Sequence, residues 1–163
     1  MRRVPRSSSR HLTPDDWPLW RRLRLAALAE APEAFGSTYD DWVDADESRW
    51  RDRLETVALH VVVEVDGVPA GMVSGAVPAD DRGGVELVSM WVDPAHRGAG
   101  VGDAAVTAVL DWAAADHPGA AVRLSVRTVN EAATRLYARH GFVDVGPSPD
   151  DPRERLMERP PKH

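Results

Sequence analysis

The sequence predicts a mixed α/β fold, with one sheet and about four helices packed against it. Valine-rich runs at Leu59–Asp66, Pro69–Val77 and Val85–Asp93 have the composition of strands. Stretches with helical spacing of apolar residues lie before and after these runs. A length of 163 residues suits one domain with its own core, so a single domain is expected over residues 1–163.

The N-terminal third is predicted to hold a short edge strand and two helices. The edge strand is expected around Arg3–Arg6. A helix is predicted from Thr13 to Glu30, because Thr13 can cap it and the proline that follows suits the first helical position. Ser37 is expected to cap a second helix that runs to about Leu54.

The remainder of the chain alternates strands and helices. The Asp66-Gly67 turn predicts a hairpin between the first two valine-rich runs. The unbroken apolar run inside Val85–Asp93 is typical of a central strand that is buried on both faces. After it, the patterns predict a helix from Val101 to about His117, a strand at Ala121–Val126, a helix at Asn130–His140, and strands at Phe142–Val145 and Glu154–Arg159. The expected order is β-α-α-β-β-β-α-β-α-β-β.

Composition excludes several classes of function. The net charge is −6, which argues against a nucleic-acid surface. There are no cysteines, and the six histidines show no metal-ligand spacing, so neither a cysteine nucleophile nor a bound metal is expected. No segment is apolar for the ~18 residues that span a membrane. The basic N-terminus has no apolar run after it, so no signal peptide is expected. A cytoplasmic protein without membrane or nucleic-acid partners is predicted.

A glycine-rich turn follows the predicted central strand. It reads Arg97-Gly98-Ala99-Gly100-Val101-Gly102, and a helical pattern begins at once. Glycines allow a tight backbone with positive φ and leave no Cβ to obstruct a ligand. Unpaired N–H groups and the positive end of the helix dipole would face this turn. The stretch therefore predicts a site for a phosphorylated ligand.

Three other interpretations of the glycine turn are weaker. A P-loop requires a lysine after its last glycine, and none is present. Gly100–Ala105 formally matches the dinucleotide fingerprint, but Asp93–Ala99 separates it from the strand and the next strand ends without an acid. A tight turn without a ligand would not require three closely spaced glycines.

Two blocks of the sequence together resemble the GCN5-related N-acetyltransferases. Residues 88–102, V-S-M-W-V-D-P-A-H-R-G-A-G-V-G, are similar to the acetyl-CoA signature of that family. The second block runs from Val126-Arg127 through Asn130 and Tyr137 to Gly141-Phe142, in the family's order and spacing. Residues 32–37 also resemble the early helix and loop of many bacterial members.

The resemblance implies a mostly antiparallel sheet whose central strands splay apart to admit acetyl-CoA. Backbone groups of the central strand would bind the pantetheine arm as an added strand would. The N–H groups of the glycine turn would hold the pyrophosphate, with Arg97 positioning the turn or pairing with phosphate. The implied cofactor-binding residues are Met90, Trp91, Val92, Arg97, Gly98, Ala99, Gly100, Val101, Gly102, Asp103 and Asn130.

The resemblance also implies catalytic roles. Tyr137 lies two helical turns after Asn130, on the same face, and would protonate the departing CoA thiolate. Its alternative role is that of a core tyrosine. Glu86 lies six residues before Val92, where the histone-acetyltransferase branch of the family carries its glutamate, and could act as the base. An ion pair at the end of a strand is an equal alternative for Glu86. Ser125 occupies the position of the glutamate found in the ribosomal-protein branch and cannot replace it.

The predicted function is transfer of an acetyl group from acetyl-CoA directly to a primary amine of a small molecule, polyamine or peptide. A non-catalytic acyl-CoA-binding or regulatory module is the alternative. Phe35, Ser37 and Tyr39 are expected to line the acceptor site. The acids of residues 40–47 are interpreted either as a solvated helical face or as a negative rim that attracts a cationic amine. A monomer or a homodimer is expected.

Overall fold

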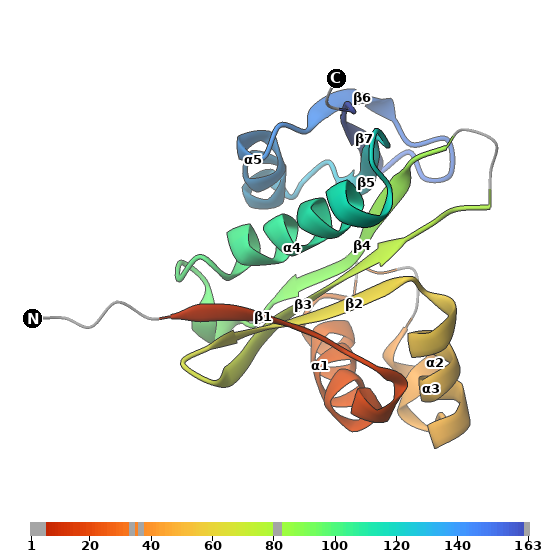
Figure 1. Ribbon diagram of the computed structural model, residues 1–163. Helices are drawn as coiled ribbons and strands as arrows, with labels where there is room; N and C mark the ends of the chain where they lie inside the picture. The colour runs from red at the N-terminus through yellow and green to blue at the C-terminus, as the bar shows by residue number, and fades with distance from the viewer. Residues whose placement is uncertain (1–5, 33–34, 36–37, 80–82, 162–163) are drawn as a thin grey trace, which may run out of the picture.

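The computed structural model describes residues 6–32, 35, 38–79 and 83–161. Within them the chain forms one sheet with five α-helices (Figure 1). The strands are β1 (Ser7–His11), β2 (Leu59–Val65), β3 (Val68–Ala76), β4 (Val85–Val92), β5 (Val122–Arg127), β6 (Val143–Pro147) and β7 (Glu154–Arg159). The helices are α1 (Trp17–Glu30), α2 (Tyr39–Val43), α3 (Glu47–Thr56), α4 (Val101–Asp116) and α5 (Glu131–Arg139), with 3₁₀ turns η1 (Pro14–Asp16) and η3 (Pro94–His96).

The sheet has seven strands in the order β1-β2-β3-β4-β5-β7-β6, which places β4 at its centre. All neighbouring strands are antiparallel except β4 and β5. That parallel pair is joined only at Val85–Val122 and Glu86–Arg123. Beyond this point the two strands separate. The predicted fold class, a mostly antiparallel sheet with splayed central strands, is confirmed.

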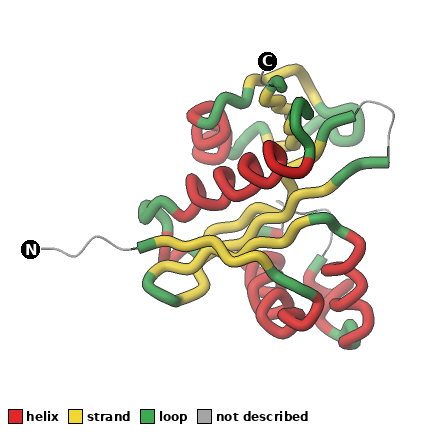
Figure 2. Tube along the Cα trace, viewed as in Figure 1, coloured by secondary structure: helices red, strands yellow, loops and turns green. Residues whose placement is uncertain are grey.

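Helices cover both faces of the sheet and enclose two apolar cores. Figures 1 and 2 show α4 and α5 on one face and α1, α2 and α3 on the other. The first core joins the sheet to α4 and α5 and includes Trp112 and Tyr137. The second joins it to the N-terminal helices and includes Trp20, Trp50 and Trp91. Strand β4 contributes to both cores, with Val85 and Leu87 in the first and Trp91 in the second. Alternation alone would keep these three residues on one face, so the shift in pairing between Val88 and Trp91 turns Trp91 to the other face.

The N-terminal helices differ from the prediction. The single helix expected from Ser37 to Leu54 is wrong, because α2 ends at Val43 and α3 begins at Glu47. Asp46 causes the break, since its side chain accepts a hydrogen bond from the Arg49 N–H (3.0 Å) and caps a new helix. Thr38 caps α2. The predicted cap Ser37 lies outside the described residues.

The first helix begins with a 3₁₀ turn. Asp16 and Thr13 form a capping box around η1, and α1 follows from Trp17. Pro18 then lies in the first turn of α1, where its missing N–H costs no helical hydrogen bond. The edge strand begins at Ser7 rather than around Arg3–Arg6, most of which lies outside the described residues.

Candidate active site

A groove of about 680 Å³ lies where β4 and β5 separate. It combines groups from β4, the glycine turn, the start of α4 and one face of α5. Its lining consists of Ala31, Met90, Trp91, Val92, Arg97, Gly98, Gly100, Val101, Gly102, Asp103, Asn130, Ala132, Ala133, Leu136, Tyr137 and Arg139. The lining residues are far apart in the sequence. The space between them exists because β4 and β5 separate.

Strand β4 is interrupted by a bulge at this groove. Met72 pairs with Trp91 and Ser74 pairs with Val88, so two steps along β3 oppose three along β4. Ser89 absorbs the extra residue with φ +57°, a conformation that is uncommon for residues other than glycine. Val88, Ser89, Met90 and Val92 are only half-buried. The expected burial of this strand on both faces is therefore wrong, because one side of it opens to the groove.

The main chain of β4 has free hydrogen-bonding groups along the groove. Beyond the Glu86–Arg123 rung, no described strand pairs with β4 on the side of β5. Backbone N–H and C=O groups require partners when they are shielded from water. An extended ligand with amide groups can satisfy them as an added strand would. This edge is thus shaped for a long, amide-bearing molecule.

The start of α4 lies at the same groove. Gly98 (φ +83°) and Gly100 (φ +79°) adopt left-handed conformations, and Gly100 is the N-cap of the helix. The N–H groups of the first helical turn have no partners within the helix, and they carry its positive dipole end. A helix that starts in this way is suited to binding phosphate groups through its backbone.

Two further glycines allow close packing around the groove. A Cβ at Gly102 would lie 2.9 Å from the Leu136 side chain, so this glycine lets α5 approach α4. Gly71 of β3 is tighter, because its Cβ would lie 2.8 Å from the Trp91 carbonyl oxygen and 2.8 Å from Val101 Cγ1. The sequence predicts that the missing Cβ at Gly102 gives access to a ligand. In the structure, the missing Cβ makes room for Leu136 and so allows the two helices to pack.

Replacing Gly71 by alanine should push β4 and α4 away from β3. Because one clashing atom is a backbone oxygen, we expect Gly71→Ala to lower the free energy of unfolding by about 1–3 kcal/mol. Urea unfolding at equilibrium measures this change. Val68→Ala, in the same strand but 52% exposed, is the control and should change stability by less than about 0.5 kcal/mol. Equal midpoints for the two variants would contradict the packing argument.

Glu30 connects the N-terminal helices to the groove. Its carboxylate accepts hydrogen bonds from Trp91 Nε1 (2.9 Å) and from Arg97 NH2 (3.1 Å). Arg97 is thereby held against the end of α1. Glu30 was missed from the sequence, since 61 and 67 residues separate it from its two partners and no local pattern marks it.

A second polar cluster connects α4 to α5. Asp103 lies 2.8 Å from His140 Nε2 and 3.2 Å from Arg139 NH2. The hydrogen bond from His140, and then that from Arg139, holds the pKa of Asp103 below its usual range. The Asp103 carboxylate is therefore bonded to α5. It does not occupy the backbone N–H groups at the start of α4, which stay available to a ligand in the groove.

Helix α5 supplies Asn130 and Tyr137 to the lining. Asn130 is its N-cap and accepts a hydrogen bond from the Ala133 N–H (3.1 Å). Tyr137 is 6% exposed and packs edge-on against Phe142. Burial raises the pKa of Tyr137 to about 12. The hydroxyl has no hydrogen-bond partner among the described residues and remains protonated at neutral pH.

Other residues predicted for the site lie elsewhere. Ala99 packs against the first core, and Glu86 lies at the last rung that joins β4 to β5, outside the groove lining. Phe35 is half-buried against the guanidinium of Arg24, whose carbon is 4.6 Å from the ring centroid. Tyr39 is 39% exposed at the start of α2. Ser37 lies outside the described residues.

Two features, a cluster of metal-ligating side chains and a helix that could span a membrane, are lacking from the described part of the chain. It contains no group of three or more His, Asp or Glu side chains arranged to hold a metal ion. None of its helices combines the length and apolar composition that crossing a membrane requires.

The fold and the groove together define a class of protein. A central strand that splays from its parallel neighbour, beside a glycine-capped helix start, is the arrangement expected of an acyl-CoA-dependent acetyltransferase. The chain belongs to the Acetyltransferase (GNAT) family, whose model matches residues 20–142.

Comparisons with individual proteins agree with this family. The chain is 38% identical over 112 residues to a mycothiol acetyltransferase of Clavibacter michiganensis, a match that covers 63% of this chain and 33% of that protein. It is 43% identical over 61 residues to the N-alpha-acetyltransferase RimI of Mycobacterium tuberculosis, which covers 37% of this chain and 36% of that protein. The matches thus span about a third of each relative.

Solved structures share the fold over nearly the whole chain. A GNAT-family acetyltransferase from Streptococcus pneumoniae superposes with a TM-score of 0.74 at 20% identity, covering 96% of this chain and 100% of that one. The structure of yncA from Salmonella typhimurium, solved with its cofactor acetyl-CoA, also superposes with a TM-score of 0.74 at 20% identity, covering 96% of this chain and 95% of that one.

Proposed function

We propose that this protein transfers an acetyl group from acetyl-CoA directly to a primary amine. The observation that carries the proposal is the separation of β4 from β5 beyond Glu86, opposite the N-terminus of α4. The names of the two curated relatives, mycothiol acetyltransferase and N-alpha-acetyltransferase, support it. So does the acetyl-CoA bound to the yncA structure.

The residues of the groove fit acetyl-CoA along its length. The main-chain groups of Met90 and Val92 would pair with the amides of the pantetheine arm. Those of Trp91 are turned toward Met72 of β3 instead, because antiparallel pairing alternates and the Asp93 N–H already donates to Ala70. The N–H groups from Gly98 to Asp103 would hold the pyrophosphate, and Arg97, held by Glu30, would keep the turn in place. Asn130 would contact the arm from the α5 side. Bound acetyl-CoA supplies the activated acetyl carbonyl.

Direct attack by the amine requires groups that stabilise charge. The sequence has no cysteine to carry the acetyl group as an intermediate. The N–H near Val92 would donate to the carbonyl oxygen as the amine nitrogen attacks the carbon. The carbon–sulfur bond then breaks and sulfur keeps the electron pair. The Tyr137 hydroxyl would donate a hydrogen bond to that sulfur as it gains charge, from the position that Tyr137 holds in the groove.

Glu86 is proposed to receive the proton of the amine. Met90 is four residues further along β4, about 13 Å at the usual strand rise, so the transfer would pass through water. A lysine-like amine with a pKa near 10.4 gains most from such a base at neutral pH. The proposal applies most strongly to an acceptor of that kind.

The Glu86→Gln variant tests this role through its pH profile. We expect kcat/KM to fall about tenfold or more below the pKa of the amine, and the deficit to shrink as pH rises and the amine loses its own proton. Glu55→Gln, an exposed change on α3, is the control and should follow the parent enzyme. A constant ratio between Glu86→Gln and the parent enzyme across the pH series would contradict a base.

The acids of residues 40–47 bear on the kind of amine that the protein accepts. Two of the acids of residues 40–47 take part in helix capping: Asp46 is the N-cap of α3, and Asp41 accepts from the Thr38 N–H in the capping box of α2. Glu47 pairs with Arg51 (3.7 Å). This supports the interpretation of these acids as a solvated helical face. The acceptor is therefore proposed only as a primary amine. Phe35 and Tyr39, which lie outside the groove lining, remain proposed as residues along its approach.

A thiol-release assay with acetyl-CoA, run across amino acids, peptides and polyamines, tests the function. Calorimetry with acetyl-CoA tests the groove separately. Binding together with turnover of at least one amine is the expected result. Binding without turnover on any amine would favour an acyl-CoA-binding module. A lack of acetyl-CoA binding would overturn the proposal.

A further inference from the structure

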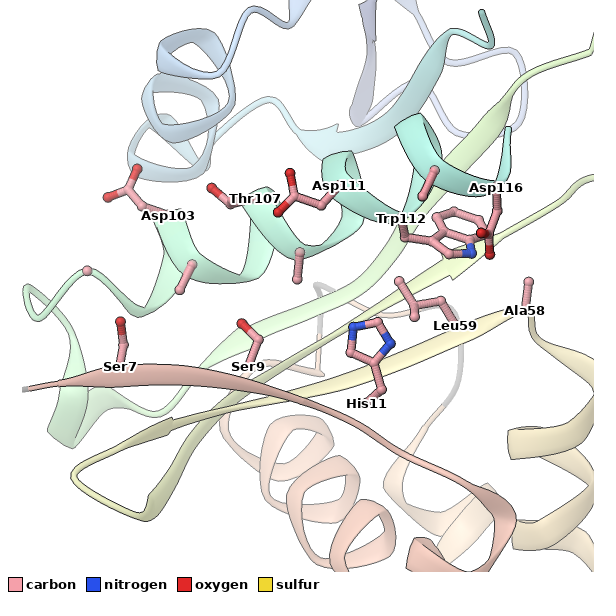
Figure 3. Close-up of a pocket in the computed structure, with 14 residues that line it drawn as sticks. Ser7, Ser9, His11, Ala58, Leu59, Asp103, Thr107, Asp111, Trp112 and Asp116 are labelled. Atoms are coloured by element: carbon pink, nitrogen blue, oxygen red, sulfur yellow. The ribbon is translucent and has the colours of Figure 1, made fainter. Parts of the chain in front are cut away.

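A second groove, of about 750 Å³, lies between the edge strand β1 and helix α4. It shares only Gly100 and Asp103 with the lining of the first groove. Figure 3 shows Ser7, Ser9 and His11 directed from β1 toward α4. Leu59, Ala104, Ala108 and Trp112 contribute apolar lining. The small side chains on both walls leave this space open.

The outer edge of β1 is free within the described part of the chain. It is the first strand of the sheet and pairs only with β2. The Leu12 N–H donates to the His60 carbonyl (2.9 Å), and the Arg6 carbonyl accepts from the Asp66 N–H (2.8 Å). Antiparallel strands alternate between inward and outward main-chain groups. Ser7, Ser9 and His11 therefore turn their N–H and C=O groups to the open edge.

The α4 wall of this groove carries negative charge. Asp103, Thr107 and Asp111 recur every four residues and form one stripe of the helix, and Asp116 lies at its end. Asp103 is paired with α5, whereas Asp111 and Asp116 have no ion-pair partner among the described residues. At the helical rise, Asp103 and Asp111 are about 12 Å apart. Among the residues that line the groove, His11 alone could carry a positive charge.

From this arrangement we propose that the groove docks an extended, basic polypeptide segment of a partner protein. The segment pairs with the outer edge of β1 and directs lysine or arginine side chains toward the α4 carboxylates. Alternate residues of a strand lie about 6.6 Å apart on one face, so two or three cations can meet the acidic stripe. This surface is separate from acyl transfer and does not depend on it.

Charge favours a basic partner over a second copy of the chain. Antiparallel pairing of two β1 strands would place both α4 helices on the same face of the joined sheet. Each would bring Asp103, Asp111 and Asp116 toward the other set, in a chain whose net charge is already −6. Like charges brought together in this way oppose association.

Fluorescence anisotropy with short labelled peptides tests the proposal at low ionic strength. The probe alternates lysine with threonine, and its matched control carries glutamate in place of lysine. The parent protein should bind the lysine peptide and not the glutamate peptide. The double variant Asp111→Asn/Asp116→Asn should weaken binding about tenfold, and less at high salt. Asp40→Asn/Asp52→Asn, with the same change of charge on exposed positions of α2 and α3, should bind as the parent does.

Edge pairing has its own test. Ser9→Pro removes one outward N–H from β1 and should therefore weaken binding about tenfold. The fold should persist, because prolines are tolerated on edge strands. A lysine peptide that is N-methylated at alternate residues lacks the N–H groups that would pair with β1. It should lose affinity for the parent protein, whose own fold is unaltered in this test. Failure of the parent to bind the lysine peptide, or equal binding by all variants, would overturn the proposal. Self-association that Ser9→Pro abolishes would assign the edge to a second copy instead.

Discussion

The Tyr137→Phe variant should lose about 100-fold in kcat while keeping its fold and its affinity for acetyl-CoA. The ring stays packed against Phe142, and no hydrogen bond to a described residue is lost with the hydroxyl. In the proposed role, the variant lacks the donor to the sulfur that gains charge as the thioester breaks. Removing one such donor from a preorganised site costs about 10²–10³ in rate.

The high pKa of Tyr137 defines how it can act. Burial raises that pKa to about 12, whereas a thiol titrates near 8.5. The phenol is thus the weaker acid, so in the proposed role it would stabilise the developing thiolate chiefly by donating a hydrogen bond during bond breaking. Its proton remains bound throughout the neutral range, so we expect no loss of activity from Tyr137 ionisation below about pH 10.

Steady-state kinetics with any amine found active, together with acetyl-CoA calorimetry, would measure the effect. The chain has two tyrosines, and the other one, Tyr39, is exposed on α2. Tyr39→Phe is therefore a matched control that should retain kcat within about threefold. An unchanged kcat for Tyr137→Phe across the pH series would leave Tyr137 as a core residue only.

The second large effect concerns stability in acid. His60 is 2% exposed, and its ring lies between the Arg53 carbonyl (3.1 Å) and the Ser74 hydroxyl (2.8 Å). Burial lowers the pKa of His60 from 6.5 to about 4. Between these two pH values the unfolded chain binds the proton and the folded chain does not. The free energy of unfolding should therefore fall by about 3 kcal/mol as pH drops from 7 to 4.

Urea unfolding at several pH values would isolate this contribution. His60→Gln should be less stable at pH 7, but its stability should change less between about pH 6.5 and 4. His11→Gln, at an exposed position, should keep the slope of the parent protein. The hydrogen bond from His140 lowers the pKa of Asp103, so Asp103 also stabilises the fold. That stabilisation is lost only below about pH 4, under the range in which His60 acts. Identical slopes for His60→Gln and the parent would contradict the prediction.

Local signals explain why most elements were predicted from the sequence. A strand rich in valine, a glycine turn and a helix start lie within a few residues of one another, and each is determined by nearby atoms. The predicted bounds of β7 match the structure, and those of β2, β3 and α4 differ by no more than about a residue. The prediction of one helix over residues 37–54 was wrong because Asp46 caps a second helix inside the helical pattern.

Long-range features could not be predicted in the same way. The bulge at Ser89 depends on how β3 pairs with β4, and serine carries no local signal for positive φ. Glu30 meets Trp91 and Arg97 only because α1 packs beneath the end of β4. Conversely, Glu86 was placed beside the site by its position in the sequence, whereas it lies at the rung where β4 and β5 are still joined.

By itself, the sequence determined the strand, glycine turn and helix that suit a phosphorylated ligand, and the helix that carries Asn130 and Tyr137. These are short-range properties, set by backbone conformation and side-chain spacing. Only the tertiary structure decided that β4 parts from β5 after Glu86, that Glu30 holds Arg97, and that an acidic groove lies beside β1. Each of these depends on groups that only the pairing of strands and the packing of helices bring together.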